Sequence, residues 1–251
     1  MSTISEPGPG IYGKVPSNGD FVTRRLPAAF VEPWDLWLQD ALSDSRDQLG
    51  ARWLEIYLTS PIWRFVLSPG LAGQDPWAGV LMPSVDRVGR YFPLTLACPL
   101  PVSGNPIQVM TGGGAWFGAA ETLLLTCLED DFDLAAFDRQ VLEMGPPPAQ
   151  PAASPMVPAA GNAFRVPLER ATELATVCPE LLRQALGELF FGYSLWWSEG
   201  SEMVQPSLLV CQGLPPTKGF SALLAGDWNQ WGWDKYPAPI SGDDPASRGS
   251  P

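Results

Sequence analysis

Prolines and glycines are spaced so densely along this chain that long uninterrupted helices or strands are not expected. The 251 residues include 28 prolines and 25 glycines, and both counts exceed average usage. Proline lacks a backbone N–H and fixes φ, whereas glycine leaves the backbone unrestricted, so both residues favour turns. The sequence therefore predicts many turns and short helices, and it argues against a helical bundle.

The composition predicts one folded α/β domain with exposed segments at its ends and within it. Apolar residues make up 45% of the chain and charged residues 17%, which is enough to build a substantial core. Residues 145–160 contain six prolines and little apolar bulk, so we expect an exposed loop there. Residues 1–10 and 237–251 are rich in glycine, proline and polar residues, and we expect a disordered arm and tail. Residues 11–236 should form the single domain.

Hydrophobic periodicity gives the expected order of elements. Apolar residues at helical spacing predict a helix from Pro33 to Gly50, with Pro33 in its first turn. Shorter helices are expected at residues 53–57, 115–128, 134–141, 181–189 and 220–224, the fourth of them following a break at Pro179. Short apolar runs bounded by turn residues predict strands at 62–67, 79–83, 91–98, 191–197 and 204–211, and the last two should form a hairpin.

The charge of the chain excludes one class of partner. Its formal net charge is −12, with three lysines and twelve arginines, so a phosphate backbone would be repelled and no nucleic acid is expected as a partner. Residues 1–10 lack the basic and apolar parts of a signal peptide, and no stretch approaches the roughly 18 apolar residues of a membrane helix. We therefore expect a cytoplasmic protein without membrane insertion.

Common catalytic and metal-binding arrangements are missing from the sequence. The chain has no histidine, which removes Ser-His and Cys-His nucleophiles and the commonest general base. Its four cysteines lie far apart without a Cys-x-x-Cys pair, so we expect reduced thiols rather than a zinc site. Residues 8–14 (GPGIYGK) match phosphate-loop strings, but only seven residues precede them and Pro16 opposes a following helix. We expect no catalytic residues, no metal and no cofactor.

Two segments concentrate charge and turn residues between apolar runs. They are residues 13–22 (GKVPSNGDFV) and residues 84–90 (SVDRVGR). Their charged and hydroxyl side chains belong to Lys14, Ser17, Asp20, Ser84, Asp86, Arg87 and Arg90. Two interpretations stay open, because such groups can pair with one another to hold the fold or can recognise a partner. In either case we expect the two segments to lie side by side.

Four short motifs follow one another between residues 13 and 215. They are GKVPSNGDFV at residues 13–22, PSVDRVGRYFPLT at 83–95, SLWW at 194–197 and GLP at 213–215. In this order the motifs resemble those of the TagF/ImpM family, whose members are associated with bacterial type VI secretion systems. The first motif has Val15 where the family usually has leucine.

The resemblance implies a fold and a function. It implies a three-layer α/β/α sandwich around a central mixed or antiparallel sheet. It also implies a non-enzymatic accessory protein that acts after translation as a negative regulator of a type VI secretion system. The implied partner is a cytoplasmic forkhead-associated scaffold protein of the same system. The candidate contacts are the seven residues of the charged segments together with Trp196 and Trp197.

Other functions and contacts stay open at this stage. A small-ligand-binding protein or an enzyme could use a charged pocket around Asp20, Asp86 and Arg87, and a purely structural component of the apparatus is a third possibility. Aromatic side chains often anchor interfaces. For that reason three tryptophans near the polar tail are further candidates, namely Trp228, Trp231 and Trp233.

Overall fold

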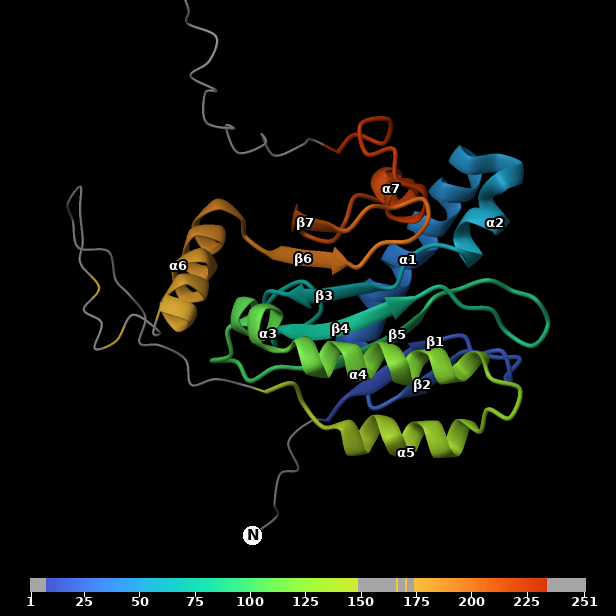
Figure 1. Cartoon of the computed structure of the whole chain (residues 1–251), viewed down its shortest axis with the longest axis horizontal. Helices are drawn as coiled ribbons and strands as arrows, with labels where there is room; N and C mark the ends of the chain where they lie inside the picture. Colours follow the sequence, from blue (N-terminus) through green and yellow to red (C-terminus); the bar gives the residue numbers. More distant parts are fainter. Residues whose placement is uncertain (1–7, 149–165, 167–169, 171–173, 234–251) are drawn as a thin grey trace, which may run out of the picture.

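One antiparallel sheet organises the protein. The computed structural model describes residues 8–148, 166, 170 and 174–233. Within these residues the sheet has seven strands in the order β2-β1-β5-β4-β3-β6-β7 (Figure 1). The strands are β1 (Gly10–Gly13), β2 (Val22–Arg24), β3 (Trp63–Leu67), β4 (Trp77–Met82), β5 (Leu94–Pro99), β6 (Tyr193–Ser198) and β7 (Ser207–Gln212). Together with the helices, this sheet confirms the predicted mixed α/β class.

The chain builds the sheet from three pieces. The β1-β2 hairpin forms one edge, and α1 (Ala28–Leu49) and α2 (Trp53–Leu58) then carry the chain to β3. A meander through β4 brings β5 back beside β1, and the β6-β7 hairpin extends the opposite edge. The remaining helices are α3 (Pro106–Gly112), α4 (Gly114–Leu125), α5 (Leu134–Met144), α6 (Leu174–Leu189) and α7 (Phe220–Ala225). None of the described helices is long and apolar enough to cross a membrane.

Each face of the sheet has its own apolar cluster. Successive strand residues point to opposite faces, so Phe65 and Leu67 of β3 join one cluster while Val66 joins the other. The first cluster is completed by side chains of α1, α2 and α7, and the second by side chains of α3, α4 and α5. Figure 1 shows α4 and α5 on the near side of the sheet and α1 behind it.

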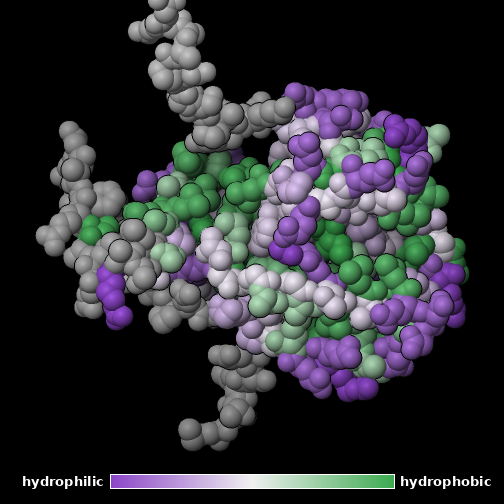
Figure 2. Space-filling model, in the orientation of Figure 1, coloured by the Kyte–Doolittle hydropathy of each residue, from purple (hydrophilic) through white to green (hydrophobic). Residues whose placement is uncertain are grey.

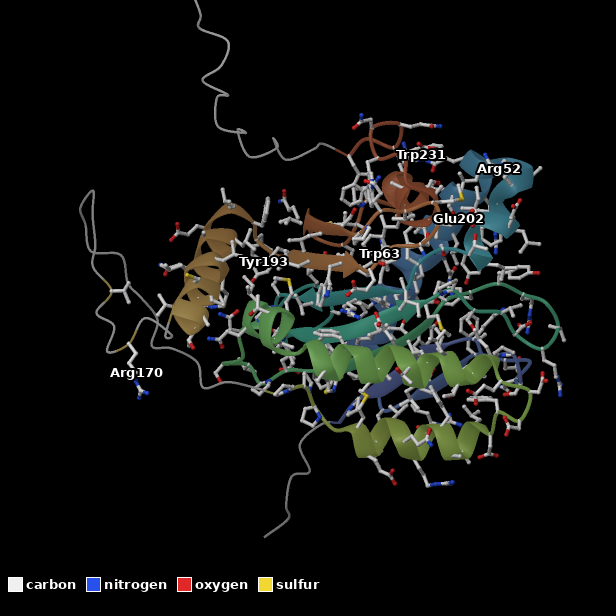
Figure 3. All side chains as sticks on the ribbon, viewed as in Figure 1. Arg52, Trp63, Arg170, Tyr193, Glu202 and Trp231 are labelled. Atoms are coloured by element: carbon white, nitrogen blue, oxygen red, sulfur yellow. The ribbon has the colours of Figure 1, made fainter. Side chains whose placement is uncertain are left out.

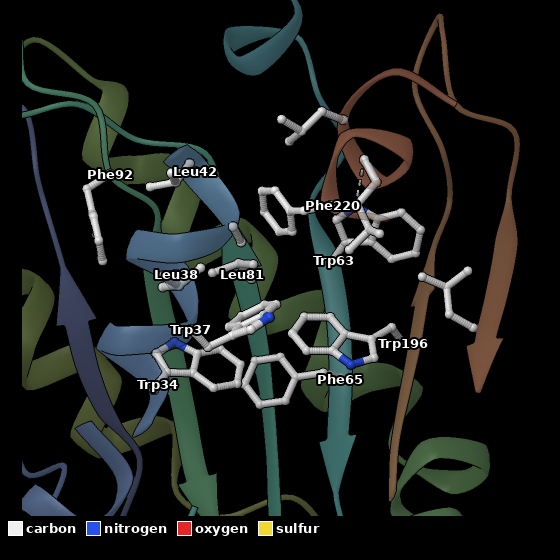
Figure 4. Close-up of a cluster of buried hydrophobic side chains, with 14 of the residues drawn as sticks. Trp34, Trp37, Leu38, Leu42, Trp63, Phe65, Leu81, Phe92, Trp196 and Phe220 are labelled. Atoms are coloured by element: carbon white, nitrogen blue, oxygen red, sulfur yellow. Dashed lines mark hydrogen bonds between the residues drawn. The ribbon is translucent and has the colours of Figure 1, made fainter. Parts of the chain in front are cut away.

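Aromatic rings fix α1 to the first face (Figure 4). Trp196 of β6 lies 5.8 Å from Trp34 and 5.4 Å from Trp37 between ring centroids, and 5.0 Å from Phe65. The indole nitrogens are also satisfied, since Trp34 donates to Thr95 Oγ1 at 2.9 Å and Trp196 to Ser194 Oγ at 2.9 Å. Such ring pairs contribute about 0.5–1.5 kcal/mol each beyond their buried area. The helix is therefore held firmly against β3 and β6.

Two prolines lie inside helices where the sequence analysis expected a start and a break. Helix α1 begins at Ala28, five residues before Pro33, and α6 runs without interruption through Pro179. Each proline is the sixth residue of its helix and removes one backbone bond, to the carbonyl of Ala29 or Ala175. Both alanines are exposed, so water can satisfy these carbonyls. The cost of each proline is therefore reduced, and both boundary predictions were wrong.

Other boundaries agree more closely. The strands β3 to β7 and the helices α2, α4, α5 and α7 overlap their predicted ranges, whereas β1, β2 and α3 were not predicted as elements. Gly10, the last residue of the predicted arm, is buried at the start of β1. Residues 1–7, 149–160 and 237–251, which make up most of the predicted arm, loop and tail, lie outside the described residues.

Candidate functional site

Two turns meet at one end of the sheet, and we call them the paired turns. They are residues 14–21, between β1 and β2, and residues 83–93, between β4 and β5. Because β1 and β5 are neighbouring strands, the turns leave the sheet side by side. The backbone N–H of Arg87 donates to the carbonyl of Asn18 at 3.0 Å, and Ser84 Oγ donates to the carbonyl of Lys14 at 2.7 Å. The structure thus brings the two charged segments together.

Gly13 allows this close approach. Its φ of 139° is unfavourable for other residues, and a Cβ at this position would lie 2.1 Å from the carbonyl oxygen of Pro93. Only glycine lets β1 pass so near the second turn. The first motif therefore needs glycine before Lys14 for a backbone reason.

The carboxylate of Asp86 is the centre of the paired turns. Its side chain has no exposed surface, and Oδ2 accepts from Lys14 Nζ at 2.9 Å and from Arg90 Nε at 2.7 Å. Oδ1 accepts the backbone N–H groups of Val88 at 3.0 Å and Arg90 at 2.8 Å. Burial opposes ionisation, but the hydrogen bonds from Arg90, Lys14 and Val88 outweigh it and hold the pKa of Asp86 well below its usual range. Both oxygens are occupied, so Asp86 is a structural anchor and not a free base.

The cation of Lys14 is also directed inward. The residue is 5% exposed, and Nζ lies 5.1 Å from the centroid of the Phe21 ring. Phe21 itself stacks on Tyr12 and meets the edge of Phe92, with centroid distances of 5.6 and 4.8 Å. Lys14 is thus fixed between a carboxylate and an aromatic face.

Helix α2 holds the start of the second turn through two hydrogen bonds, and we call this contact the clamp. The hydroxyl of Tyr57 donates to the carbonyl of Ser84 at 2.9 Å and accepts from its N–H at 2.9 Å. Burial raises the pKa of Tyr57 above its usual range, so the hydroxyl stays neutral and can serve both roles. Ser84 is 2% exposed and belongs to this clamp. Tyr57 was not among the predicted site residues, because it is far from both charged segments along the chain.

The outer side of the paired turns carries arginines. Arg87 is exposed beside Val88, and its guanidinium makes no ion pair with any residue that the structure describes. The Arg90 side chain is 58% exposed while it bonds to Asp86 and to the carbonyl of Gly19. Arg46 of α1 reaches the carbonyl of Tyr91 at 3.4 Å. In a chain of net charge −12, this end is locally rich in cations.

The remaining predicted contacts separate into exposed and core residues. Ser17 and Asp20 are exposed on the first turn. Trp196, in contrast, is fully buried in the aromatic cluster of the first face. It has no surface to offer a partner, so its predicted contact role was wrong. Trp197 points to the other face. Its ring is half-buried, and the centroid of that ring lies 4.7 Å from the centroid of the Phe117 ring.

The tryptophans after α7 form a separate group. All three are half-buried, and Trp233 Nε1 donates to the carbonyl of Gly219 at 2.9 Å. Trp228 meets the edges of Trp63 and Trp233, with ring centroids 6.3 and 5.6 Å apart. Figure 3 shows Trp231 beside α7, away from the paired turns. These rings mainly secure the segment that follows α7.

The charged pocket of the ligand hypothesis gains no support from this geometry. A ligand reaching Asp86 would have to displace four donors of the chain itself. A cavity of about 390 Å³ lies instead between α3 and α6, which carry none of the candidate residues. In the part of the chain that the structure describes, no three His, Cys, Asp or Glu side chains gather as metal ligands.

The chain is similar to one family of known proteins. The family model of the TagF N-terminal domain, described as type VI secretion system-associated, matches residues 10–144 and so includes both paired turns. The crystal structure of PA0076 from Pseudomonas aeruginosa PAO1 is similar, with 39% sequence identity and a TM-score of 0.76. That similarity covers 94% of this chain and 100% of the other. A comparison with curated proteins finds no match.

Proposed function

The chain belongs to the TagF family of type VI secretion system-associated proteins, and from this premise we propose that it is a non-enzymatic negative regulator of such a system. It acts after translation, in the cytoplasm, by binding a forkhead-associated scaffold protein of the same system. The family resemblance also implies a three-layer α/β/α sandwich, which the two apolar clusters on opposite faces of the sheet support.

The exposed Arg87 on a fixed turn is the observation that carries the proposed contact. Its neighbour Asp86 holds the turn through four hydrogen bonds, and its own N–H is bonded to Asn18. A side chain on a preorganised turn loses less entropy when it binds. Arginine is enriched at interface hot spots and can hold a carboxylate with two parallel bonds. The paired turns therefore suit an acidic patch on the scaffold.

Arg87→Ala tests this contact. We expect binding to the purified scaffold to weaken by about 2 kcal/mol or more, which is roughly 30-fold. The melting temperature should stay within about 2 °C of the wild type, because an exposed side chain without a partner contributes little to stability. In cells the same change should release secretion. Arg139→Ala, at an exposed position of α5, is the matched control and should change neither property.

The outcomes separate the alternatives. A well-folded Arg87→Ala protein that binds the scaffold as tightly as the wild type would refute the contact. The same holds for a destabilised variant whose folded fraction binds normally. Persistent, stoichiometric assembly with the secretion apparatus would instead indicate a structural component.

A further inference from the structure

The two edges of the sheet differ in how they are protected. Edge strand β2 has three residues, includes the exposed Arg24, and is followed by Arg25 at a φ of 59°. Short length, charge and distortion are the usual devices that keep an edge from pairing with another chain. Edge strand β7 has six residues, SLLVCQ, none of them charged. Its only strand partner among the described residues is β6.

The stretch of chain around β7 is uncharged as well. No charged residue occurs between Glu202 and Lys218, although the chain has 15 basic and 27 acidic residues. A net charge of −12 would oppose the approach of a second copy at most of the surface. At this edge the nearest charges lie outside the strand, and solution ions screen them over about 8 Å. The edge is therefore a place where two copies can meet without like charges in contact.

One face of β7 is also apolar and open. Leu208 and Val210 stand opposite Trp197 and Leu195 of β6, so they point to the second face of the sheet. Their exposed fractions are 57% and 47%. Helices α3 and α4 cover β3, β4 and β5 on this face, and Figure 2 shows apolar side chains gathered between α6 and β7. Leu208 and Val210 thus form an exposed apolar row, which continues the face of the sheet that α3 and α4 cover elsewhere.

We propose that β7 pairs with β7 of a second copy, antiparallel and about a two-fold axis at Leu209. In this register Leu208 of each copy faces Val210 of the other. The Leu208–Val210 pair therefore occurs twice in the dimer, and each exposed apolar side chain gains one apolar partner. Centring on Leu208 or Val210 instead would place Pro206 or Gln212 opposite the remaining apolar residue. A pair of six-residue strands is a small contact compared with a standard interface, which buries about 1,200–2,000 Å². The dimer is therefore weak, and its amount depends on the protein concentration.

Sedimentation over a concentration series tests the pairing. The average mass of the sedimenting species should rise from the 27.1 kDa of one chain toward twice that value as the protein concentration increases. Val210→Lys places a charge in the row and should weaken self-association at least tenfold while leaving the melting temperature unchanged. The matched control is Leu142→Lys on α5, where the leucine is 55% exposed, and it should associate like the wild type. A wild type that stays monomeric, or a Val210→Lys protein that dimerises equally well, would overturn the proposal.

Disulfide trapping tests the register independently. In a Cys178→Ser background, Leu208→Cys and Val210→Cys proteins are oxidised separately and as a mixture. Directly opposed residues in an antiparallel pair have Cβ atoms about 4.5–5.5 Å apart, so the mixture should form linked dimers and each protein alone should form few. Linkage of Leu208→Cys alone as efficient as in the mixture would exclude an axis at Leu209.

Discussion

Replacing Trp196 with alanine removes the ring that connects α1 to two strands. Trp196 is fully buried and contacts Trp34, Trp37 and Phe65. A buried Trp→Ala change costs about 3–5 kcal/mol, and three lost ring pairs place this one near the upper end of that range. In a chain of this size each kcal/mol shifts the melting temperature by about 2–4 °C. We therefore expect a fall of about 10–20 °C.

Thermal unfolding followed by circular dichroism measures this effect, with scaffold binding measured on the same preparation. Trp197→Ala is the matched comparison, because the neighbouring ring is only half-buried and contacts Phe117, and its stability loss should be clearly smaller. Binding by Trp196→Ala should fall only in proportion to its unfolded fraction. A Trp196→Ala protein that melts within about 2 °C of the wild type yet fails to bind would show that Trp196 is a partner contact and that the core assignment is wrong.

Three further predictions follow from buried groups. Because the pKa of Asp86 is lowered in the folded state, its stabilisation is present above the unfolded pKa of about 4 and is lost as the pH falls below it. Asp86→Asn should therefore lose less melting temperature than the wild type on acidification below pH 4, and an equal loss would contradict this. Arg64 bonds Glu121 at 2.7 and 2.8 Å, and Arg64→Lys should lower the unfolding free energy in urea by about 1 kcal/mol through loss of the paired geometry; unchanged stability would be the contrary result. A thiol reagent at pH 8 should modify Cys178 alone in the native protein. Cys178 is exposed, whereas Cys98, Cys127 and Cys211 are buried, and burial raises the pKa of each of these three thiols to about 12. A second thiol that reacts equally fast would contradict this prediction.

Local signals explain the parts of the fold that the sequence predicted. Asp133 directly precedes the helix predicted at residues 134–141, and its carboxylate accepts the N–H of Ala136 at 2.6 Å at the start of α5. Gly50 was expected to end a helix, and it follows α1 with a φ of 54°. Such caps depend on a few neighbouring residues, so they can be read without knowledge of the rest of the chain.

Elements that depend on distant partners were missed or misplaced. Strands β1 and β2 are only four and three residues long, and they exist because β5 supplies the neighbouring edge. Helix α3 did carry a local signal, because Asn105 caps it and Pro106 follows in the first turn, but it was not predicted. Pro179 was taken as a break because propensity ignores the exposure of the carbonyl that it leaves free.

Neighbouring residues with similar chemistry can face opposite environments, and this limits how far a site can be predicted. Trp196 and Trp197 alternate across the sheet, and the pattern of the strand does not tell which face carries an aromatic core.

Asp86 and Arg87 show the same limit in the paired turns. Both were candidates for partner contact, yet the fold uses every acceptor of Asp86 and leaves the guanidinium of Arg87 at the surface. Under the proposed function, stability and recognition are therefore separable within two adjacent residues. Loss of the Asp86 carboxylate should release both turns, and scaffold binding should then fall together with the melting temperature. Loss of the Arg87 guanidinium should leave the turns in place and remove binding alone, so a scaffold titration of the two alanine variants at matched folded fractions distinguishes a contact from its support.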